Sequence, residues 1–304
     1  MEYVFRTDQL CKHYKHFKAL NGLTMNVPKG AIYGFVGRNG AGKTTLIRLL
    51  CGLQFPTGGS FELYGKSSSS SDISAARRRV GAVVESPSLF PEMTAEENLR
   101  YQYRLLGMPD YDGIPELLKL VGLDGTGKKR AKDFSLGMRQ RLGIAAALCG
   151  DPDLLVLDEP INGLDPQGII EIRELILKLN HERKITFIIS SHILDELARL
   201  ATHYGFIDSG RIVREMSAEE LESACHKSLK VHVTDTSALA GVLDDMALEY
   251  TITDTSHAEI YGRPVISDLV FALADKDCKL ISCTECEETL EGFFISLVGG
   301  GSNE

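Results

Sequence analysis

The eight residues from Gly37 to Thr44, Gly-Arg-Asn-Gly-Ala-Gly-Lys-Thr, have a composition and spacing suited to binding phosphate. They fit the pattern of a glycine, four residues and then Gly-Lys-Thr, in which glycines let backbone N–H groups turn inward around an anion. In such a loop the lysine reaches the β- and γ-phosphates, and the threonine hydroxyl binds Mg²⁺. The predicted nucleoside triphosphate site comprises Gly37, Arg38, Asn39, Gly40, Ala41, Gly42, Lys43, Thr44 and Thr45.

The context of this loop favours a phosphate site over a plain glycine-rich turn before a helix. An apolar run at residues 31–36 precedes the loop, and Leu46, Ile47, Leu49 and Leu50 follow it with helical spacing. A buried strand would deliver the loop, and a helix N-terminus would face the phosphates, where the helix dipole stabilises negative charge.

Asp158 and Glu159 end a second apolar run, residues 154–157, and two acids there are costly to bury unless they have a function. Beside a phosphate loop, Asp158 is predicted to bind Mg²⁺, directly or through water, and Glu159 to act as general base on the attacking water. The alternative is a pair of helix-capping acids. His192 follows another apolar strand, at the sheet edge where ligands of open α/β folds bind, although a lone histidine is more often structural.

The elements that must position these residues alternate between strand and helix patterns, which favours a largely parallel sheet covered on both faces. The expected fold is α/β: a P-loop NTPase core with an antiparallel β subdomain in residues 1–30 and a helical insertion at about 88–150. We expect a nucleotide-binding domain at 1–218 and a small α+β accessory domain at 219–304. The segments expected in the latter are strands at 229–233, 250–253 and 279–282 and helices at 237–248 and 287–298.

Composition limits the class of protein. The 304 residues carry a net charge of −9, which argues against broad nucleic-acid binding, and no apolar run approaches the length of a membrane span. The N-terminus lacks the pattern of a signal peptide, so a cytoplasmic chain is expected, with any membrane role arising through a partner. Cys283 and Cys286, with Cys278 nearby, have zinc-like spacing, but no second pair completes a four-ligand site.

Several further motifs follow the phosphate loop along the chain. Phe134, Ser135, Leu136, Gly137 and Met138 resemble the signature motif of the ATP-binding subunits of ABC transporters. The resemblance covers most of residues 1–220 and extends to several other positions. These are the Walker B pair Asp158-Glu159, the D-loop residues 162–165 ending in Asp165, the switch histidine His192, and Tyr14 as the aromatic residue that stacks on adenine.

The resemblance implies MgATP hydrolysis, with ATP and Mg²⁺ as cofactors and Lys43, Glu159 and His192 as catalytic residues. It also implies a homodimer, in which Ser135 and the N–H of Gly137 contact the γ-phosphate bound by the second copy, since they begin a helix. A separate transmembrane permease would hold the chain on the inner face of the cell membrane. Leu136 and Met138 depart from the usual Gly and Gln of the signature, but the contacting Ser and Gly remain.

Glu85 stands where most of this family has a glutamine, and we expect it to contact Mg²⁺ and to couple the site to the permease. Glu85 and the segments 83–99, 134–148 and 159–169 are similar to the bacitracin-export and lantibiotic-immunity branch. That branch implies export. The alternative is a soluble ATPase of the same family in translation or DNA repair, which the single P-loop and the acidic charge disfavour.

Overall fold

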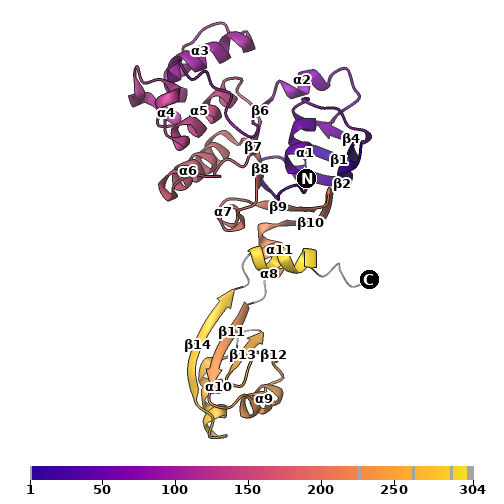
Figure 1. The fold of residues 1–304 in the computed structure, drawn as a ribbon, viewed down its shortest axis with the longest axis vertical. Coiled ribbons are helices and arrows are strands. Elements are labelled where there is room, and N and C mark those ends of the chain that lie inside the picture. The colour runs from indigo at the N-terminus through magenta and orange to yellow at the C-terminus, as the bar shows by residue number, and fades with distance from the viewer. Residues whose placement is uncertain (1, 225–226, 262–263, 288–289, 300–304) are drawn as a thin grey trace. The chain divides into compact units, whose positions relative to one another are not determined.

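The computed structural model describes residues 2–224, 227–261, 264–287 and 290–299 (Figure 1). The chain forms two compact units, Met1–Ala218 and Glu219–Glu304. Each unit has its own cluster of buried hydrophobic side chains. The mixture of parallel sheet, antiparallel sheets and helices confirms the expected α/β class.

A six-stranded sheet with the order β10-β9-β3-β8-β7-β6 forms the centre of the first unit. Its strands are β3 (Ile32–Val36), β6 (Val80–Val83), β7 (Leu154–Asp158), β8 (Thr186–Ser191), β9 (His203–Asp208) and β10 (Arg211–Ser217). Neighbouring strands are parallel except β9 and β10. Every residue of β3, β7 and β8 is buried, as expected of apolar runs in a sheet with both faces covered.

Parallel strands end at the same edge of a sheet, and this determines which polar residues meet. The loop at 37–42 follows β3 and leads into α1 (Lys43–Leu50), whereas Asp158 ends β7 and His192 follows β8. The remaining helices of the core are α6 (Pro166–Arg183) and α7 (Leu194–Ala198). The three central strands thus deliver the phosphate loop, the paired acids and the histidine to one edge.

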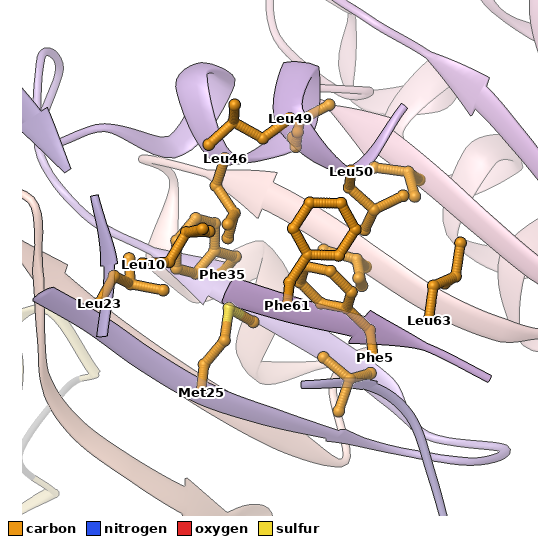
Figure 2. Close-up of a cluster of buried hydrophobic side chains, with 14 of the residues drawn as sticks. Phe5, Leu10, Leu23, Met25, Phe35, Leu46, Leu49, Leu50, Phe61 and Leu63 are labelled. Carbon is orange, nitrogen blue, oxygen red and sulfur yellow. The ribbon is translucent and has the colours of Figure 1, made fainter. Parts of the chain in front are cut away.

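A four-stranded antiparallel sheet with the order β2-β1-β4-β5 precedes and flanks this core. Its strands are β1 (Tyr3–Tyr14), β2 (Phe17–Pro28), β4 (Gly58–Leu63) and β5 (Lys66–Ser67), followed by the short helix α2 (Ile73–Arg77). Figure 2 shows α1 contributing Leu46, Leu49 and Leu50 to one cluster with Phe5 and Phe61 of this sheet. Because α1 packs by this apolar face, the sheet supports the helix that begins at the phosphate loop.

A buried polar contact also joins the antiparallel sheet to the core. The hydroxyl of Tyr33 on β3 donates to Glu215 Oε1 at 2.6 Å, and the backbone N–H of Asn26 on β2 donates to the same oxygen at 2.8 Å. Burial, with the neighbouring Glu215 charge, raises the pKa of Tyr33 well above its usual value. Tyr33 therefore stays a neutral donor, and the carboxylate of Glu215 holds β2, β3 and β10 together.

A helical segment separates β6 from β7. It contains α3 (Ala95–Leu106), α4 (Ile114–Leu120) and α5 (Leu136–Leu148), with single 3₁₀ turns at Asp124–Thr126 and Ala131–Asp133. Thr94 and Glu97 form a reciprocal capping box that satisfies backbone donors at the start of α3. The buried amide of Asn98 accepts from Phe90 N–H at 2.8 Å and donates to the carbonyl of Thr94 at 2.9 Å, which holds the preceding loop against α3.

The second unit has its own strand and helix order. After α8 (Ala218–Ala224) come β11 (Lys227–Val233), α9 (Thr236–Asp245), β12 (Glu249–Ile252), β13 (His257–Tyr261), α10 (Ile266–Ala274), β14 (Leu280–Glu287) and α11 (Leu290–Gly299). From β11 to β14 this is a βαββαβ succession, and the antiparallel sheet has the order β12-β13-β11-β14, as in ferredoxin-like domains.

Three elements of this unit were not predicted. The sequence predicts three strands and two helices there, whereas the structure adds α8 before the first predicted strand, and β13 and α10 between the predicted segments. β13 has only five residues, and α10 is apolar at nearly every position, so neither has the clear periodicity on which such predictions depend. Among the described residues no group of three or more His, Cys, Asp or Glu side chains is arranged to hold a metal, and the side chain of Cys286 lies outside them.

Candidate functional site

The phosphate loop requires glycine at several positions, because of positive φ angles or because a Cβ would have no space. Gly40 and Gly42 have φ angles of 84° and 114°, in the region that favours glycine. A Cβ on Gly37 would lie 2.5 Å from the carbonyl oxygen of Ile207, and one on Gly42 would lie 2.5 Å from that of Ala19. The loop is therefore both tightly turned and closely packed against β9 and β2, which leaves its backbone N–H groups in a fixed arrangement.

Lys43 is the buried cation of the site, with 5% of its surface exposed. Its ammonium donates to the carbonyl of Gly37 at 2.6 Å and lies 3.3 Å from Glu159 Oε1. A buried charge needs such partners because burial without them is costly. The pair joins the phosphate loop directly to the acids that follow β7.

Glu159 is held from two sides. Its second oxygen, Oε2, accepts from His192 Nδ1 at 2.7 Å, since an ionised carboxylate is an acceptor only. Its backbone N–H donates to Ser190 Oγ at 3.0 Å, and its φ of 50° is in the left-handed region. This backbone geometry turns the side chain out of the strand direction and toward Lys43 and His192.

Asp158 lies behind this row and is 2% exposed. The hydroxyl of Ser190 donates to its Oδ1 at 2.5 Å. Burial raises the pKa of the nearby Cys51 thiol to about 12, against an opposing effect of Arg77 and with a smaller contribution in the same direction from the Asp158 charge. Cys51 therefore remains a neutral thiol beside the site.

A cavity of about 340 Å³ brings Lys43, Glu159 and His192 together, whereas Asp158 is not among its lining residues. Its lining combines the phosphate loop with residues from the ends of β7 and β8 and from β2. The lining residues are Phe17, Ala19, Arg38, Asn39, Gly40, Gly42, Lys43, Thr44, Thr45, Glu159, Asn162 and His192. The cavity is polar on the loop side and has one exposed aromatic ring, that of Phe17, which is 58% exposed.

Phe17 and Asn162 line this cavity, but sequence reasoning did not assign them to the nucleotide site. Phe17 begins β2 directly opposite Tyr14 across a tight hairpin, so the two aromatic residues are alternatives for the same base-stacking role. Tyr14 is not among the lining residues; its hydroxyl donates to Gln54 Oε1 at 2.5 Å. The signal available in the sequence was a second aromatic residue, Phe17, three residues after Tyr14.

Glu85 is also outside the cavity lining. Its carboxylate forms an ion pair with Arg48 on α1, and both side chains are more than one third exposed. The φ of Glu85 is 62°, in the left-handed region. The structure thus brings Glu85 to the helix that follows the phosphate loop, rather than to Thr44, Asp158 and Glu159.

The signature residues form a separate group at the start of α5. Ser135 is the N-cap residue, and its hydroxyl accepts from Met138 N–H at 3.2 Å. Phe134 is buried, and Leu136 is 40% exposed. A Cβ built on Gly163 would lie 3.4 Å from Leu136, so this end of α5 lies beside the residue 162–165 turn.

Asp165 has a local structural role in that turn. Its side chain accepts from Gly168 N–H at 3.2 Å and caps α6. None of the residues from Phe134 to Met138 lines the cavity described above. The signature group and the phosphate loop of one chain therefore present two separate surfaces.

Oxygen donors available at the cavity fit Mg²⁺. Thr44 supplies a hydroxyl and Glu159 a carboxylate in the lining, and Asp158 precedes Glu159 at the end of β7, where Ser190 donates to it. Mg²⁺ is usually bound through one or two side chains together with phosphate oxygens and water, so a cluster of three acidic ligands is not needed.

Comparison with known proteins agrees with this geometry. The ABC transporter family model matches residues 20–162. The chain is 38% identical over 303 residues to the bacitracin transport ATP-binding protein BcrA of Enterococcus faecalis, covering 99% of this chain and 98% of that protein. It is 42% identical over 220 residues to the lantibiotic transport ATP-binding protein SrtF of Streptococcus pyogenes, covering 72% of this chain and 93% of that protein.

A solved structure extends the agreement to the fold. The structure of cbiO1 from Clostridium perfringens, part of the ABC transporter complex cbiONQ, matches with a TM-score of 0.66 and 26% identity, covering 81% of this chain and 97% of that chain. The comparisons give no support to a role in translation or DNA repair. The chain belongs to the ABC transporter family, as one of its ATP-binding, ATP-hydrolysing subunits.

Proposed function

We propose that this chain hydrolyses MgATP in the cavity at the end of β3, β7 and β8, and that two copies drive export through a separate membrane subunit. The observation that carries the chemistry is the row from Lys43 through Glu159 to His192, with atom separations of 3.3 and 2.7 Å. The row lies against a loop whose backbone donors can surround phosphates. It therefore combines phosphate binding and a general base in one cavity.

Each side chain has a distinct role in this proposal. Lys43 binds the β- and γ-phosphates, which replace part of its present pairing with Gly37 and Glu159. Thr44 and Asp158 hold Mg²⁺, which neutralises phosphate charge when bound. Glu159 accepts the proton of the attacking water, and His192 orients that carboxylate through Nδ1. Phe17 stacks on the base at the outer end of the cavity.

The position of the signature residues supports a homodimer. Ser135 caps a 13-residue helix whose N-terminus favours anions, and yet the residues from Phe134 to Met138 do not line the cavity of their own chain. A second copy related by two-fold symmetry supplies its signature to this cavity, and each chain contributes to two sites. Closure around ATP and release after hydrolysis then provide the movement that the membrane subunit uses.

A second cavity, of about 220 Å³, supports attachment to a membrane subunit. It lies between β6 and helices α3 and α5, beside the loop that follows Glu85, and is lined in part by Ser86, Pro87 and Leu89. Exposed apolar side chains occur on the same helical segment, including Leu105 at 65% and Phe90 at 41%. Among the described residues no helix has both the length and the apolarity to cross a bilayer. The exposed apolar side chains beside this cavity support a contact that holds the chain on the inner membrane face.

The role of Glu85 follows from its ion pair. Glu85 begins the loop that lines the second cavity, and Arg48 belongs to the helix that begins with Lys43. The pair therefore links the proposed permease contact to the phosphate loop. Contact between Glu85 and Mg²⁺ requires this exposed pair to open, which costs at most about 1 kcal/mol.

The names of the relatives support a class of cargo. BcrA of Enterococcus faecalis is a bacitracin transport protein and SrtF of Streptococcus pyogenes is a lantibiotic transport protein. Both names refer to peptide antibiotics. We propose export of an antimicrobial peptide, with resistance or immunity as the result.

The proposal is tested by purifying the full-length tagged chain from detergent-solubilised membranes of its native host. We expect stoichiometric recovery of one multi-helix membrane protein and an ATPase activity of that complex that a peptide antibiotic stimulates. Deletion of the gene for that membrane protein should sensitise cells to the same peptide. Recovery of the chain from the cytosol alone, or with ribosomes or DNA-processing proteins, would reject the transport proposal.

A further inference from the structure

Helix α10 of the second unit has an apolar outer surface. Of its nine residues only Ser267 and Asp268 are polar, whereas a helix that packs by one face normally presents polar residues on the other. Leu269 and Leu273 are fully buried and fasten the helix to the sheet. The outward side chains, which we call the α10 surface, are Val265 (61% exposed), Ile266 (43%), Val270 (40%) and Phe271 (71%).

Two of these side chains share one face of the helix, because Ile266 and Val270 are four residues apart. Phe271 lies further round the helix, and Val265 precedes it as the N-cap residue. Exposed apolar side chains gathered on one short helix, beside charged residues, are a feature of binding sites. Within the described part of the chain, the buried cluster of the second unit includes none of the four.

The unit that carries this surface is strongly acidic. Residues 219–304 contain 17 Asp and Glu against five Lys and Arg, a net charge of −12, whereas residues 1–218 carry +3 of the total of −9. The nearest lysine in sequence, Lys276, is paired with Asp245 on α9 at 3.1 Å. The acids on α10, at its C-terminal end and at the end of α9 are Asp268, Asp275, Asp277, Asp244 and Asp245.

This charge selects among possible occupants. An anionic membrane surface repels a unit of net charge −12, and so does a second copy of the same acidic unit. A cationic partner is attracted. Cytoplasmic segments of membrane proteins carry an excess of Lys and Arg close to their membrane spans, and an amphipathic segment of that type offers both an apolar face and basic flanks.

We propose that the α10 surface binds a basic amphipathic cytoplasmic segment of the membrane subunit. This inference rests on the proposed function, because it assumes that such a subunit exists. Phe271 and Val270 contact the apolar face of the segment, and the acids of α9 and α10 pair with its lysines and arginines. The second unit is then an attachment point that selects the membrane subunit, separate from the cavity beside β6.

The first test compares full-length chains purified from native membranes. The double substitution Phe271→Ser with Val270→Ser removes two exposed apolar side chains, and Asp268→Lys with Asp275→Lys reverses the charge. We expect each to lower recovery of the membrane subunit at least tenfold at low salt, with unchanged ATPase activity of the isolated chain. The control Leu177→Ser changes an apolar residue on α6 that is 41% exposed, about as much as Val270, and should retain full recovery.

The outcomes separate the two proposals. If the wild-type chain recovers no membrane protein, the proposed function itself fails. If it does recover one, and both double variants recover the same amount, the α10 inference is overturned while the transport proposal stands. Circular dichroism melting of each variant shows that it is folded, and the charge-reversal variant keeps the test valid should the serine variant be unstable.

A cross-link identifies the occupant directly. Phe271→p-benzoylphenylalanine in the full chain, irradiated in native membranes, should attach to a Lys- and Arg-rich cytoplasmic segment of the membrane subunit, as mapped by mass spectrometry. The same probe at Leu177 is the control. Attachment to lipid, to a second copy of the chain or to residues 1–218, or a yield no higher than at Leu177, would overturn the inference.

Discussion

Glu159 is the residue on which the chemistry of the site converges. One of its carboxylate oxygens lies 3.3 Å from the Lys43 ammonium, and the other accepts from His192. Its two oxygens thus point at the phosphate loop and at the residue after β8. A carboxylate held in this way is fixed in orientation before a substrate arrives, which is the condition for efficient general-base catalysis.

The substitution Glu159→Gln tests this role. Glutamine keeps the size and one acceptor oxygen but cannot take a proton, so we expect turnover to fall roughly 10²- to 10⁴-fold. Removing its negative charge also favours bound phosphates, so ATP should accumulate on a dimer that elutes earlier in gel filtration. ATPase activity and elution volume with ATP give the two readouts. Wild-type turnover in this variant would exclude Glu159 as the base.

A second residue-scale prediction concerns the two aromatic residues of the first hairpin. Phe17 lines the cavity and Tyr14 instead binds Gln54, so Phe17→Ala should weaken ATP binding about tenfold, as expected for loss of one ring stacked on a base. The matched variant Tyr14→Ala should alter binding less than about threefold. Titration with a fluorescent ATP analogue measures both. The reverse order of effects would assign stacking to Tyr14.

Residue types and spacing predicted the phosphate loop and the paired acids, because each follows an apolar strand that is recognisable in the sequence, whereas His192 was predicted mainly from the family resemblance. The structure brings Lys43, Glu159 and His192 together. Residues whose role depends on the direction of a side chain were harder to predict from the sequence. Phe17 and Tyr14 stand opposite each other at one hairpin end, and sequence spacing does not say which ring faces the loop. Glu85 has the left-handed backbone that directs it to Arg48, and no sequence pattern reveals that direction.

At the scale of elements, the contact between α5 and the loop after β6 links the signature helix to the core. A Cβ built on Gly143 would lie 2.6 Å from Cβ of Pro87, so glycine permits the close approach. Pro87 also lines the cavity proposed for the membrane subunit. Any displacement of α5 would therefore meet this loop by direct contact.

The substitution Gly143→Ala tests that contact. The added methyl group must displace Pro87 or α5, and overpacking of this kind costs about 1–3 kcal/mol in the free energy of unfolding. Gly125→Ala is the control, because a Cβ there meets no atom within 4 Å and its φ is not positive. Urea unfolding measures both variants. Equal stability of the two would mean that the loop moves aside without cost.

Elements were predictable where their apolar pattern was strong. The buried strands β3, β7 and β8 correspond to continuous apolar runs, and α3 begins at a capping box that is visible in the sequence. In the second unit β13 and α10 escaped prediction. α10 is short and apolar at nearly every position, and such a run cannot be assigned to a helix or a strand by periodicity alone.

The molecule as a whole divides its charge unequally. The nucleotide-binding part, residues 1–218, carries +3 and the remainder carries −12. Each unit therefore favours a ligand of the opposite charge: the anionic nucleotide for residues 1–218 and a basic partner segment for residues 219–304. The average composition hides this division, because the net charge of −9 alone indicates only an acidic protein.

Stability of the first unit should depend strongly on alkaline pH. Burial raises the pKa of both the Cys51 and the Cys149 thiols from 9.0 to about 12, and it raises that of Tyr33 as well. These groups keep their protons in the folded chain above pH 9, whereas in the unfolded chain the thiols lose them. Unfolding then releases protons, so rising pH favours the unfolded state.

The sign and slope of the pH dependence of the free energy of unfolding follow from this difference in thiol pKa between the folded and unfolded chain. The contribution of the two thiols to the free energy of unfolding is complete below pH 9 and declines as pH rises toward 12. For two thiols that ionise only on unfolding, the decline is about 2.7 kcal/mol per pH unit. Urea unfolding at a series of pH values under reducing conditions measures the decline. In a Cys51→Ala and Cys149→Ala variant the slope between pH 9 and 10 should become markedly shallower, because only the tyrosines and exposed groups still titrate. An unchanged slope would show that alkaline unfolding of this chain starts elsewhere than at its buried thiols.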